Sequence, residues 1–223
     1  MNNNKNEKLP VLYSAQKLDI KFPEPLEQIK KEGEKTIKLI KSQGTYTPKG
    51  QVFINRKSIS HLLATDSKGG RILYNNLDEE DKMENGQEKY TTVESIQKEI
   101  SKRIQEPRDT IQRERLKYSE DALKVFRDTP ELEKIRELEE SKIRKELPIV
   151  KQKKLRVEKI DEITGEPLTN PDIHHKDRVA DNPRRALDDK NLSALNKPTH
   201  DFLHKNGIET EEEFEKYKKA NKS

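Results

Sequence analysis

The sequence predicts an α+β protein, in which charged helices and a small α+β region precede a C-terminal unit of two strands and two helices. The 223-residue chain is 39% charged and only 29% hydrophobic, and it has no tryptophan, which is too little apolar material for one large core. Residues 93–147 have a strongly helical composition, whereas short apolar runs between turn signals occur on both sides of them. We therefore expect a small compact unit attached to helical or partly disordered arms.

Three parts of the chain precede the C-terminal unit. Residues 1–23 are polar, and we interpret them as a mobile arm. Residues 24–92 are expected to form a small α+β or partly disordered region. Residues 93–148 are expected to be a charged helical connector, which Pro107 and Pro130 divide into helices because proline disrupts a helix interior.

Residues 24–92, the expected α+β region, contain helix and strand patterns. Apolar residues at near-helical spacing predict a helix over residues 24–43, and Gly44 is a plausible stop for it. Residues 51–55 and 71–74 are predicted to be strands, and a short helix is expected between them at residues 58–65.

The C-terminal domain is expected over residues 150–223, in the order strand, turn, strand, loop, helix, helix. KLRVEKI, at residues 154–160, alternates like a strand. ITGEPL, at residues 163–168, is typical of a turn, and a second extended segment is expected to run from it to His174. Residues 178–190 are charged and loop-like.

Capping signals define the two helices of this domain. Asn196 can cap a helix that begins at Lys197, and Gly207 is expected to end it. Thr210 and Glu213 have the spacing of a capping box, which predicts a last helix after Thr210.

Composition also limits the chemistry of the protein. The chain has no cysteine, which excludes disulfides, thiolate zinc sites and a cysteine nucleophile. Its net charge of +4 permits a polyanionic partner without requiring one. The first residues lack the apolar core of a secretory signal, and no apolar run is long enough to cross a bilayer, so we expect a soluble cytoplasmic protein without a membrane partner.

Four of the five histidines lie in one short window, DIHHKDRVADNPRRALDDKNLSALNKPTHDFLH, at residues 172–204. His200 and His204 are four residues apart on a predicted helix, so they share one face and can bind one metal ion. A third ligand can come from the adjacent pair His174 and His175 at the end of the second strand. Neighbours in a strand point to opposite faces, so one of the pair can bind the metal while the other serves as a base.

Asn191 lies between the histidine pair and the helix. Its amide can accept a hydrogen bond from a histidine ring, which would select the tautomer whose other nitrogen is a free base, or it can tie two loops together. The fifth histidine, His61, stands alone far upstream, and we assign it no function.

The order of these residues resembles the HNH nuclease motif of the ββα-metal fold, and within it the variant of colicin-type DNases. The resemblance covers about residues 150–208, and ITGEPL is similar to the turn that joins the two strands in many HNH domains. Many HNH domains carry CxxC pairs, which this chain and the colicin type both lack. The positions that match are His174, His175, Asn191, His200 and His204.

The resemblance implies a role for each matched residue. It implies that His174, His200 and His204 bind one divalent ion. It implies that His175 is the general base that activates water, and that Asn191 orients His175. The implied reaction is hydrolysis of DNA phosphodiester bonds, in which the ion stabilises the developing charge and the products carry 5′-phosphate ends.

Two further expectations concern the metal and the DNA. Three histidine ligands without a carboxylate suit Zn²⁺, Ni²⁺ or Mn²⁺ better than Mg²⁺, which is not excluded. Basic residues near the motif are candidates for phosphate contacts, although aspartates are interleaved with them. These candidates are Lys176, Arg178, Arg184 and Arg185.

Several biological settings agree with this hypothesis. We favour an endonuclease of a phage or mobile element, in which the upstream region binds DNA. A nuclease toxin would instead have an inhibitor or immunity protein as a partner, and a restriction-like defence enzyme would cut specific sequences. The rival from another class is a non-enzymatic adaptor with a degenerate histidine site, which binds nucleic acid or protein.

Overall fold

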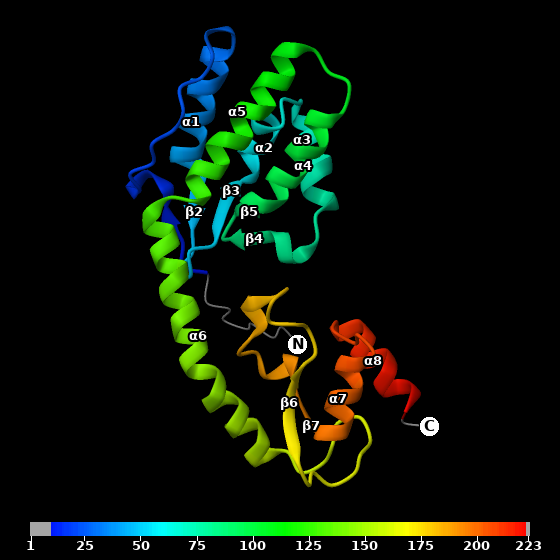
Figure 1. The fold of residues 1–223 in the computed structure, drawn as a ribbon. Coiled ribbons are helices and arrows are strands. Elements are labelled where there is room, and N and C mark those ends of the chain that lie inside the picture. Colours follow the sequence, from blue (N-terminus) through cyan, green and yellow to red (C-terminus); the bar gives the residue numbers. More distant parts are fainter. Residues whose placement is uncertain (1–9, 222–223) are drawn as a thin grey trace, which may run out of the picture. The chain divides into compact units, whose positions relative to one another are not determined.

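The protein is an α+β chain of two compact units (Figure 1). The computed structural model describes residues 10–221, and the units comprise Met1–Glu137 (unit 1) and Leu138–Ser223 (unit 2). The long helix α6 (Pro130–Val157) begins in unit 1 and ends in unit 2.

Unit 1 contains a five-stranded antiparallel sheet in the order β1-β2-β3-β5-β4. Strand β3 is buried along its whole length, because VFIN lies in the middle of the sheet. Strands β4 and β5 form a hairpin in which Gly86 has a φ of +63°, a conformation that suits glycine. The strands are β1 (Tyr13–Ser14), β2 (Gly44–Tyr46), β3 (Val52–Asn55), β4 (Lys82–Asn85) and β5 (Glu88–Thr92).

Helices pack against this sheet and build the main core of unit 1. Asp66, Thr92 and Asp109 cap three of them, each with a side-chain oxygen that accepts a hydrogen bond from a backbone N–H of the first turn. The core joins Ile54 of the sheet to Ile100 and Phe126 of the helices, all fully buried. The helices are α1 (Lys30–Gln43), α2 (Ile59–Leu62), α3 (Ser67–Asn76), α4 (Val93–Gln105) and α5 (Thr110–Arg127).

The structure corrects three expectations for the upstream part of the chain. The charged helical connector expected at residues 93–148 is corrected for its first part, because α4 and α5 bury one apolar face in the core of unit 1, whereas α6 has only Leu132 buried and runs from unit 1 into unit 2. Residues 10–23 of the expected arm are packed as well, since Ala15 and Ile20 are buried, whereas residues 1–9 lie outside the described part. Residues 71–74 are helical in α3 and do not form a strand.

Other expectations for unit 1 are confirmed. The helix predicted before Gly44 is α1, the strand at residues 51–55 is β3, and the short helix after it is α2. The three helices predicted on either side of Pro107 and Pro130 are α4, α5 and α6.

Unit 2 is built on one hairpin and two helices that follow it. Strand β6 (Pro171–His175) pairs antiparallel with β7 (Leu192–Asn196), and Ile173 lies opposite Ala194. Helix α7 (Lys197–Lys205) continues directly from β7, and α8 (Glu211–Ala220) follows after a short turn.

Two small apolar clusters hold this unit together. On one side of the hairpin, Ile173, Leu192 and Ala194 pack with Val150, Leu155 and Leu168. On the other, Ile163, Leu195, Leu203 and Phe214 pack with Ile208 and Tyr217. The end of α6 is thereby fixed to the hairpin, and α7 and α8 are fixed to its opposite side.

The first strand predicted for this unit is wrong. Lys154–Ile160 was expected to alternate as a strand, but its first residues form the last turn of α6, which continues through Pro148. Only Ile160 makes a β-bridge, to Pro167. The strand partner of β6 is therefore β7, and the site lies at a hairpin with a long loop.

The local signals in unit 2 are confirmed. ITGEPL is a turn, in which the Asp161 carboxylate accepts hydrogen bonds from the Ile163 and Thr164 amides and Gly165 has a φ of +73°. Helix α7 begins at Lys197, and the capping box predicted at Thr210 is present at the start of α8.

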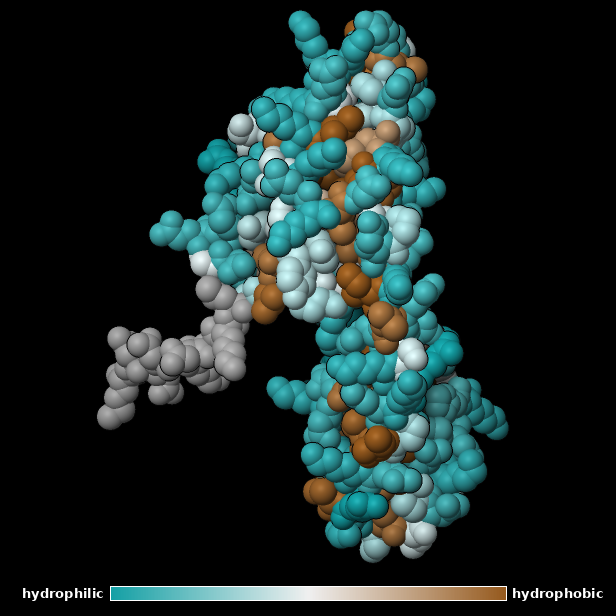
Figure 2. Space-filling view, turned by 90° about the vertical axis from the view of Figure 1, so that its left-hand side faces the viewer, coloured by the Kyte–Doolittle hydropathy of each residue, from teal (hydrophilic) through white to brown (hydrophobic). Residues whose placement is uncertain are grey.

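The face of the protein shown in Figure 2 is mostly hydrophilic. Figure 2 shows apolar side chains that interrupt this surface on the side of unit 1 that carries α1. Val11, Tyr13 and Leu26 of this unit are exposed. None of the helices in residues 10–221 combines the length and the apolar character that a membrane span requires.

Candidate metal and catalytic site

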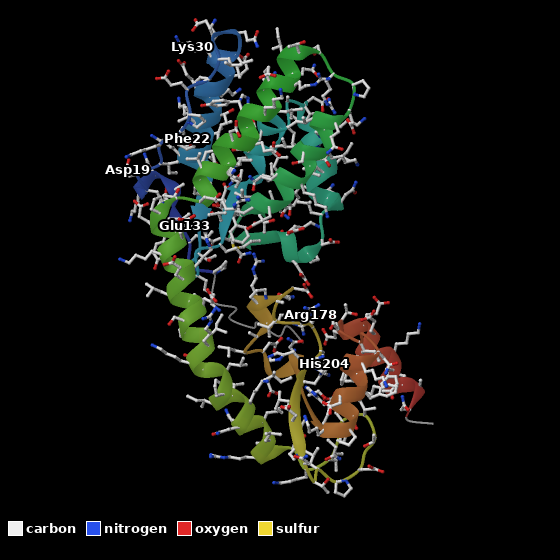
Figure 3. All side chains as sticks on the ribbon, viewed as in Figure 1. Asp19, Phe22, Lys30, Glu133, Arg178 and His204 are labelled. Carbon is white, nitrogen blue, oxygen red and sulfur yellow. The ribbon has the colours of Figure 1, made fainter. Side chains whose placement is uncertain are left out.

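Three histidines from two elements converge in unit 2. His174 lies on β6, and His200 and His204 lie one turn apart on α7. Figure 3 shows His204 on this helix. Because α7 continues from the strand that pairs with β6, the hairpin register fixes the helix beside His174. Their candidate ligand nitrogens all lie within 4.8 Å of one another. The sequence prediction that these three residues meet is thereby confirmed.

The rings of this cluster contact one another closely. The centroid of His174 lies 5.5 Å from that of His200 and 5.2 Å from that of His204, and the two helix rings are 4.6 Å apart. The fourth neighbour is Phe214 of α8, whose ring stacks on His174 at 5.8 Å. An apolar wall therefore covers one side of the cluster.

The chemistry of this cluster fits a divalent cation. His174 is only 2% exposed, yet neither of its ring nitrogens has a hydrogen-bond partner among residues 10–221. Nδ1 of His200 is also buried without a hydrogen bond, and it lies 3.6 Å from a carboxylate oxygen of Asp201. A buried polar atom without a partner costs roughly 1–3 kcal/mol, so such groups usually have a function. Three imidazole nitrogens around one point are a ligand set that transition metals favour.

The electrostatics keep His174 in the form that can bind a metal. Burial lowers the pKa of His174 to about 4, and the nearby His200 and His204 act in the same direction. The ring is therefore neutral at pH 7, and a neutral imidazole is the state that coordinates metal ions.

His175, the next residue on β6, has a different environment. Its Nε2 lies 3.1 Å from the backbone oxygen of Ala186. A carbonyl oxygen can only accept, so Nε2 carries the hydrogen and Nδ1 is left as the basic nitrogen. Burial lowers the pKa of His175, although the bond to Ala186 opposes this, and the ring is neutral at pH 7.

Asn191 is fully buried and ties the loop between the strands together. Its Oδ1 accepts a hydrogen bond from the Asp177 amide at 2.8 Å, and its Nδ2 donates to the carbonyls of Asp177 and Arg185 at 3.2 and 3.1 Å. The direct bond to the His175 ring implied by the HNH resemblance is not among these contacts, because the Ala186 carbonyl takes that place. Asn191 therefore acts on His175 indirectly, by fixing the residue before Ala186.

The basic residues proposed to contact phosphate differ in their environments. Lys176 is only 7% exposed, and its Nζ donates to Glu162 at 2.9 Å and to Glu215 at 3.2 Å while lying over the Phe214 ring. Its charge is therefore used inside the unit, which argues against the phosphate contact that we expected of it.

The side chains of the three arginines are less buried than that of Lys176. Arg185 forms ion pairs with Asp177 and Glu211, which connect the loop to α8. Arg178 donates to Glu209 at 2.7 Å, and Figure 3 shows it on the loop that follows β6. Arg184 is exposed on the same loop.

A cleft of about 360 Å³ opens over the histidines. Sequence reasoning missed three of its charged residues, Lys151, Asp172 and Glu209. No local pattern separated Lys151 from the charged run around it, because its position became defined only through the extension of α6 past Pro148. The cleft is lined by Lys151, Asp172, Ile173, His174, His175, Arg178, Val179, Ala180, His200, His204 and Glu209.

Unit 1 contains a larger cleft with different chemistry. It measures about 600 Å³ and is lined by Ile20, Val125 and charged residues of both signs, without a histidine. The histidine of this unit, His61, has its Nε2 3.1 Å from the Thr36 hydroxyl and 3.2 Å from the Glu32 carbonyl, which are structural contacts. Volume alone therefore does not locate the chemistry of this protein.

Comparisons with known proteins do not supply a function. No family model, curated protein or solved structure matches this chain. Function has to be argued from the site itself, since a general fold class hosts many activities. The site offers a metal-ligand set and a neutral histidine beside it.

Proposed function

We propose that this protein is a metal-dependent endonuclease of the HNH type that hydrolyses DNA phosphodiester bonds. The observation that carries the proposal is the cluster of His174, His200 and His204, in which both ring nitrogens of His174 are buried without a hydrogen-bond partner among residues 10–221, with the neutral His175 lining the same cleft. The order of β6, β7 and α7 supports it, because a ββα-metal site consists of two strands followed by a helix. We place the enzyme in a phage or mobile element.

The proposed site would hold one divalent ion on His174, His200 and His204. When bound, this ion supplies a Lewis acid that stabilises negative charge on the phosphate and on the leaving 3′ oxygen. The all-nitrogen ligand set favours Zn²⁺, Ni²⁺ or Mn²⁺ over Mg²⁺.

His175 acts as the general base in this mechanism. Its Nδ1 takes a proton from water while the water oxygen attacks phosphorus. The P–O3′ bond breaks, and the leaving oxygen receives a proton from solvent, which gives a 3′-hydroxyl and a 5′-phosphate. The Ala186 carbonyl holds Nε2–H throughout and stabilises the imidazolium that forms, because this hydrogen bond raises the pKa of His175.

Plasmid cleavage tests the proposal. Full-length protein stripped with EDTA is incubated with supercoiled plasmid and Mn²⁺, Ni²⁺, Zn²⁺ or Mg²⁺. We expect nicked or linear products, and we expect His175→Ala to lower the rate at least about 100-fold while metal binding is unchanged. Unchanged cutting by His175→Ala would exclude it as the base, and full activity in EDTA would exclude the metal.

A second candidate is a structural metal site in a nucleic-acid-binding or protein-binding adaptor. The position of His174 favours it, because a metal held with His200 and His204 would join β6 to α7, and the His174 ring already stacks on Phe214 of α8. Structural metal sites contribute folding energy directly. This candidate predicts metal binding without cleavage by the wild-type protein. A nuclease toxin predicts cleavage that a dedicated immunity protein inhibits.

A further inference from the structure

Lys151 is held at the edge of the histidine cleft by the packing of α6. Val150 and Leu155, on either side of it in sequence, pack against the apolar cluster under the hairpin. Lys154 fixes the same turn, because its Nζ donates to the backbone oxygen and to Oδ2 of Asp189 at 3.3 and 3.2 Å. The backbone position of Lys151 is thus defined, and its side chain lines the cleft.

The Asp172 carboxylate lines the same cleft, but the ammonium of Lys151 has no ion-pair partner among residues 10–221. Its side chain is partly buried, and it forms no hydrogen bond or ion pair with any residue from 10 to 221. Arg178, on the same cleft, is paired with Glu209. Lys151 also lies near enough to lower the pKa of both His174 and His175. A partly desolvated ammonium beside neutral rings is costly unless an anion binds it.

We propose that Lys151 binds a phosphate oxygen of the polynucleotide in this cleft and positions the scissile phosphodiester beside His175. Lysine suits this role because its ammonium is a compact charge that phosphates attract. The inference rests on the proposed nuclease function, of which it names the substrate-binding residue. It also replaces Lys176, whose ammonium is already bound by Glu162 and Glu215.

A matched pair of substitutions tests the inference. Lys151→Gln removes the charge and keeps a polar side chain of similar length, and Lys151→Arg keeps the charge. The control is Lys142→Gln on the same helix, which is exposed and makes no hydrogen bond or ion pair with the described residues. It lies nine residues earlier, about two and a half turns, and therefore on the opposite side of α6.

Binding is measured first, because it does not depend on catalysis. A labelled DNA duplex is titrated with the full chain in EDTA over a series of KCl concentrations. One lost phosphate contact lowers the slope of log K against log salt by about 0.9, and we expect this for Lys151→Gln. Lys142→Gln should keep the wild-type slope, and so should Lys151→Arg.

Cleavage of the same duplex with metal is the second measurement. We expect Lys151→Gln to lower kcat/KM by roughly 10- to 100-fold, Lys151→Arg to retain most activity, and Ni²⁺ affinity to be equal in all variants. Circular dichroism melting should show little loss of stability in Lys151→Gln, because no hydrogen bond or ion pair with the described residues is removed.

The two measurements separate the inference from the function on which it rests. If wild type cuts DNA and Lys151→Gln matches Lys142→Gln in slope and in kcat/KM, the phosphate role of Lys151 is excluded and the nuclease stands. If the salt dependence of Lys151→Gln shows the loss of one phosphate contact but the wild type does not cut DNA, the phosphate-binding role of Lys151 is supported and the nuclease function is excluded.

Discussion

Units 1 and 2 fill their interiors with different kinds of side chain. The buried polar side chains of unit 1 are small and uncharged: Thr36, Asn55, Ser58, Thr91, Thr92, Ser95, Ser119 and Thr129. Those of unit 2 include a carboxylate, an ammonium and an imidazole: Asp161, His174, Lys176, Asn191, Ser193 and Asn196. Both sets belong to the described residues. Unit 1 has one large apolar core, whereas unit 2 combines two small apolar clusters with paired buried charges and a histidine cluster.

This difference shows where burial of polar groups costs stability. A buried charge or an unpaired imidazole is unfavourable unless a partner compensates for it. Among its described residues, unit 1 buries no complete charged side chain, although Nε of Arg113 is buried without a hydrogen bond, and its core is continuous from Ala15 to Leu132. Unit 2 has two small clusters and places ionisable groups between them. Strained or costly arrangements of this kind are typical of functional sites.

The largest expected effect comes from a mutation that creates a cavity in the core of unit 1. Phe126→Ala removes a fully buried ring from α5 and should destabilise unit 1 by about 3–5 kcal/mol. Hydrogen–deuterium exchange of unit 1 peptides measures this loss, and the metal affinity of unit 2 should not change. Ile111→Ala on the same helix, at a side chain that is 53% exposed, is the control and should cost less than about 0.5 kcal/mol. A fall in metal affinity equal to that of a ligand mutant would show that the units are not independent.

The second test removes a metal ligand from unit 2. His174→Ala should lower the affinity for Zn²⁺ or Ni²⁺ on the order of 100-fold or more, since one of three ligands is lost. In the wild type, metal at about 100 times its Kd should stabilise unit 2 by about 2.7 kcal/mol, and this protection should disappear in the mutant. Calorimetric titration and exchange of unit 2 peptides measure both effects. Metal protection that survives in His174→Ala would place the site elsewhere.

The smallest expected effect concerns the charges buried in unit 2. Burial alone would raise the pKa of Glu162, but its bonds to Lys218 and Lys176 outweigh burial and lower the pKa to about 2. The folded pKa is below the unfolded value, so the stabilisation is complete above about pH 4.5 and is lost as the pH falls towards 2. We expect the unfolding midpoint of wild type in EDTA to approach that of Glu162→Gln as the pH falls over this range. A constant difference between the two proteins would contradict the pKa assignment.

Local signals in the sequence predicted the helical half of the site. The spacing of His200 and His204 required only that residues 197–205 be helical, and Gly207 and the Thr210 capping box fixed the helix boundaries. The meeting of these residues with His174 is confirmed by the structure. The nuclease activity stays a prediction.

The strand half of the site could not be predicted in the same way. LSALN, the partner of β6, is buried at every position and shows no alternation, so its sequence gave no strand period. KLRVEKI alternates, but helix α6 continues into it because Val150 and Leu155 pack on the hairpin. Tertiary packing therefore determined the secondary structure of both segments. The same is true of α4 and α5, where the high charge concealed a buried apolar face.

Binding of the proposed ion at His174 would have a consequence for the life of the protein in a cell. A unit that gains a large part of its stability from a bound ion opens more often when that ion is scarce, and opened chains are removed by proteases. The amount of protein would then follow the supply of transition metal. Chains made under starvation would be degraded before they could accumulate in an inactive form.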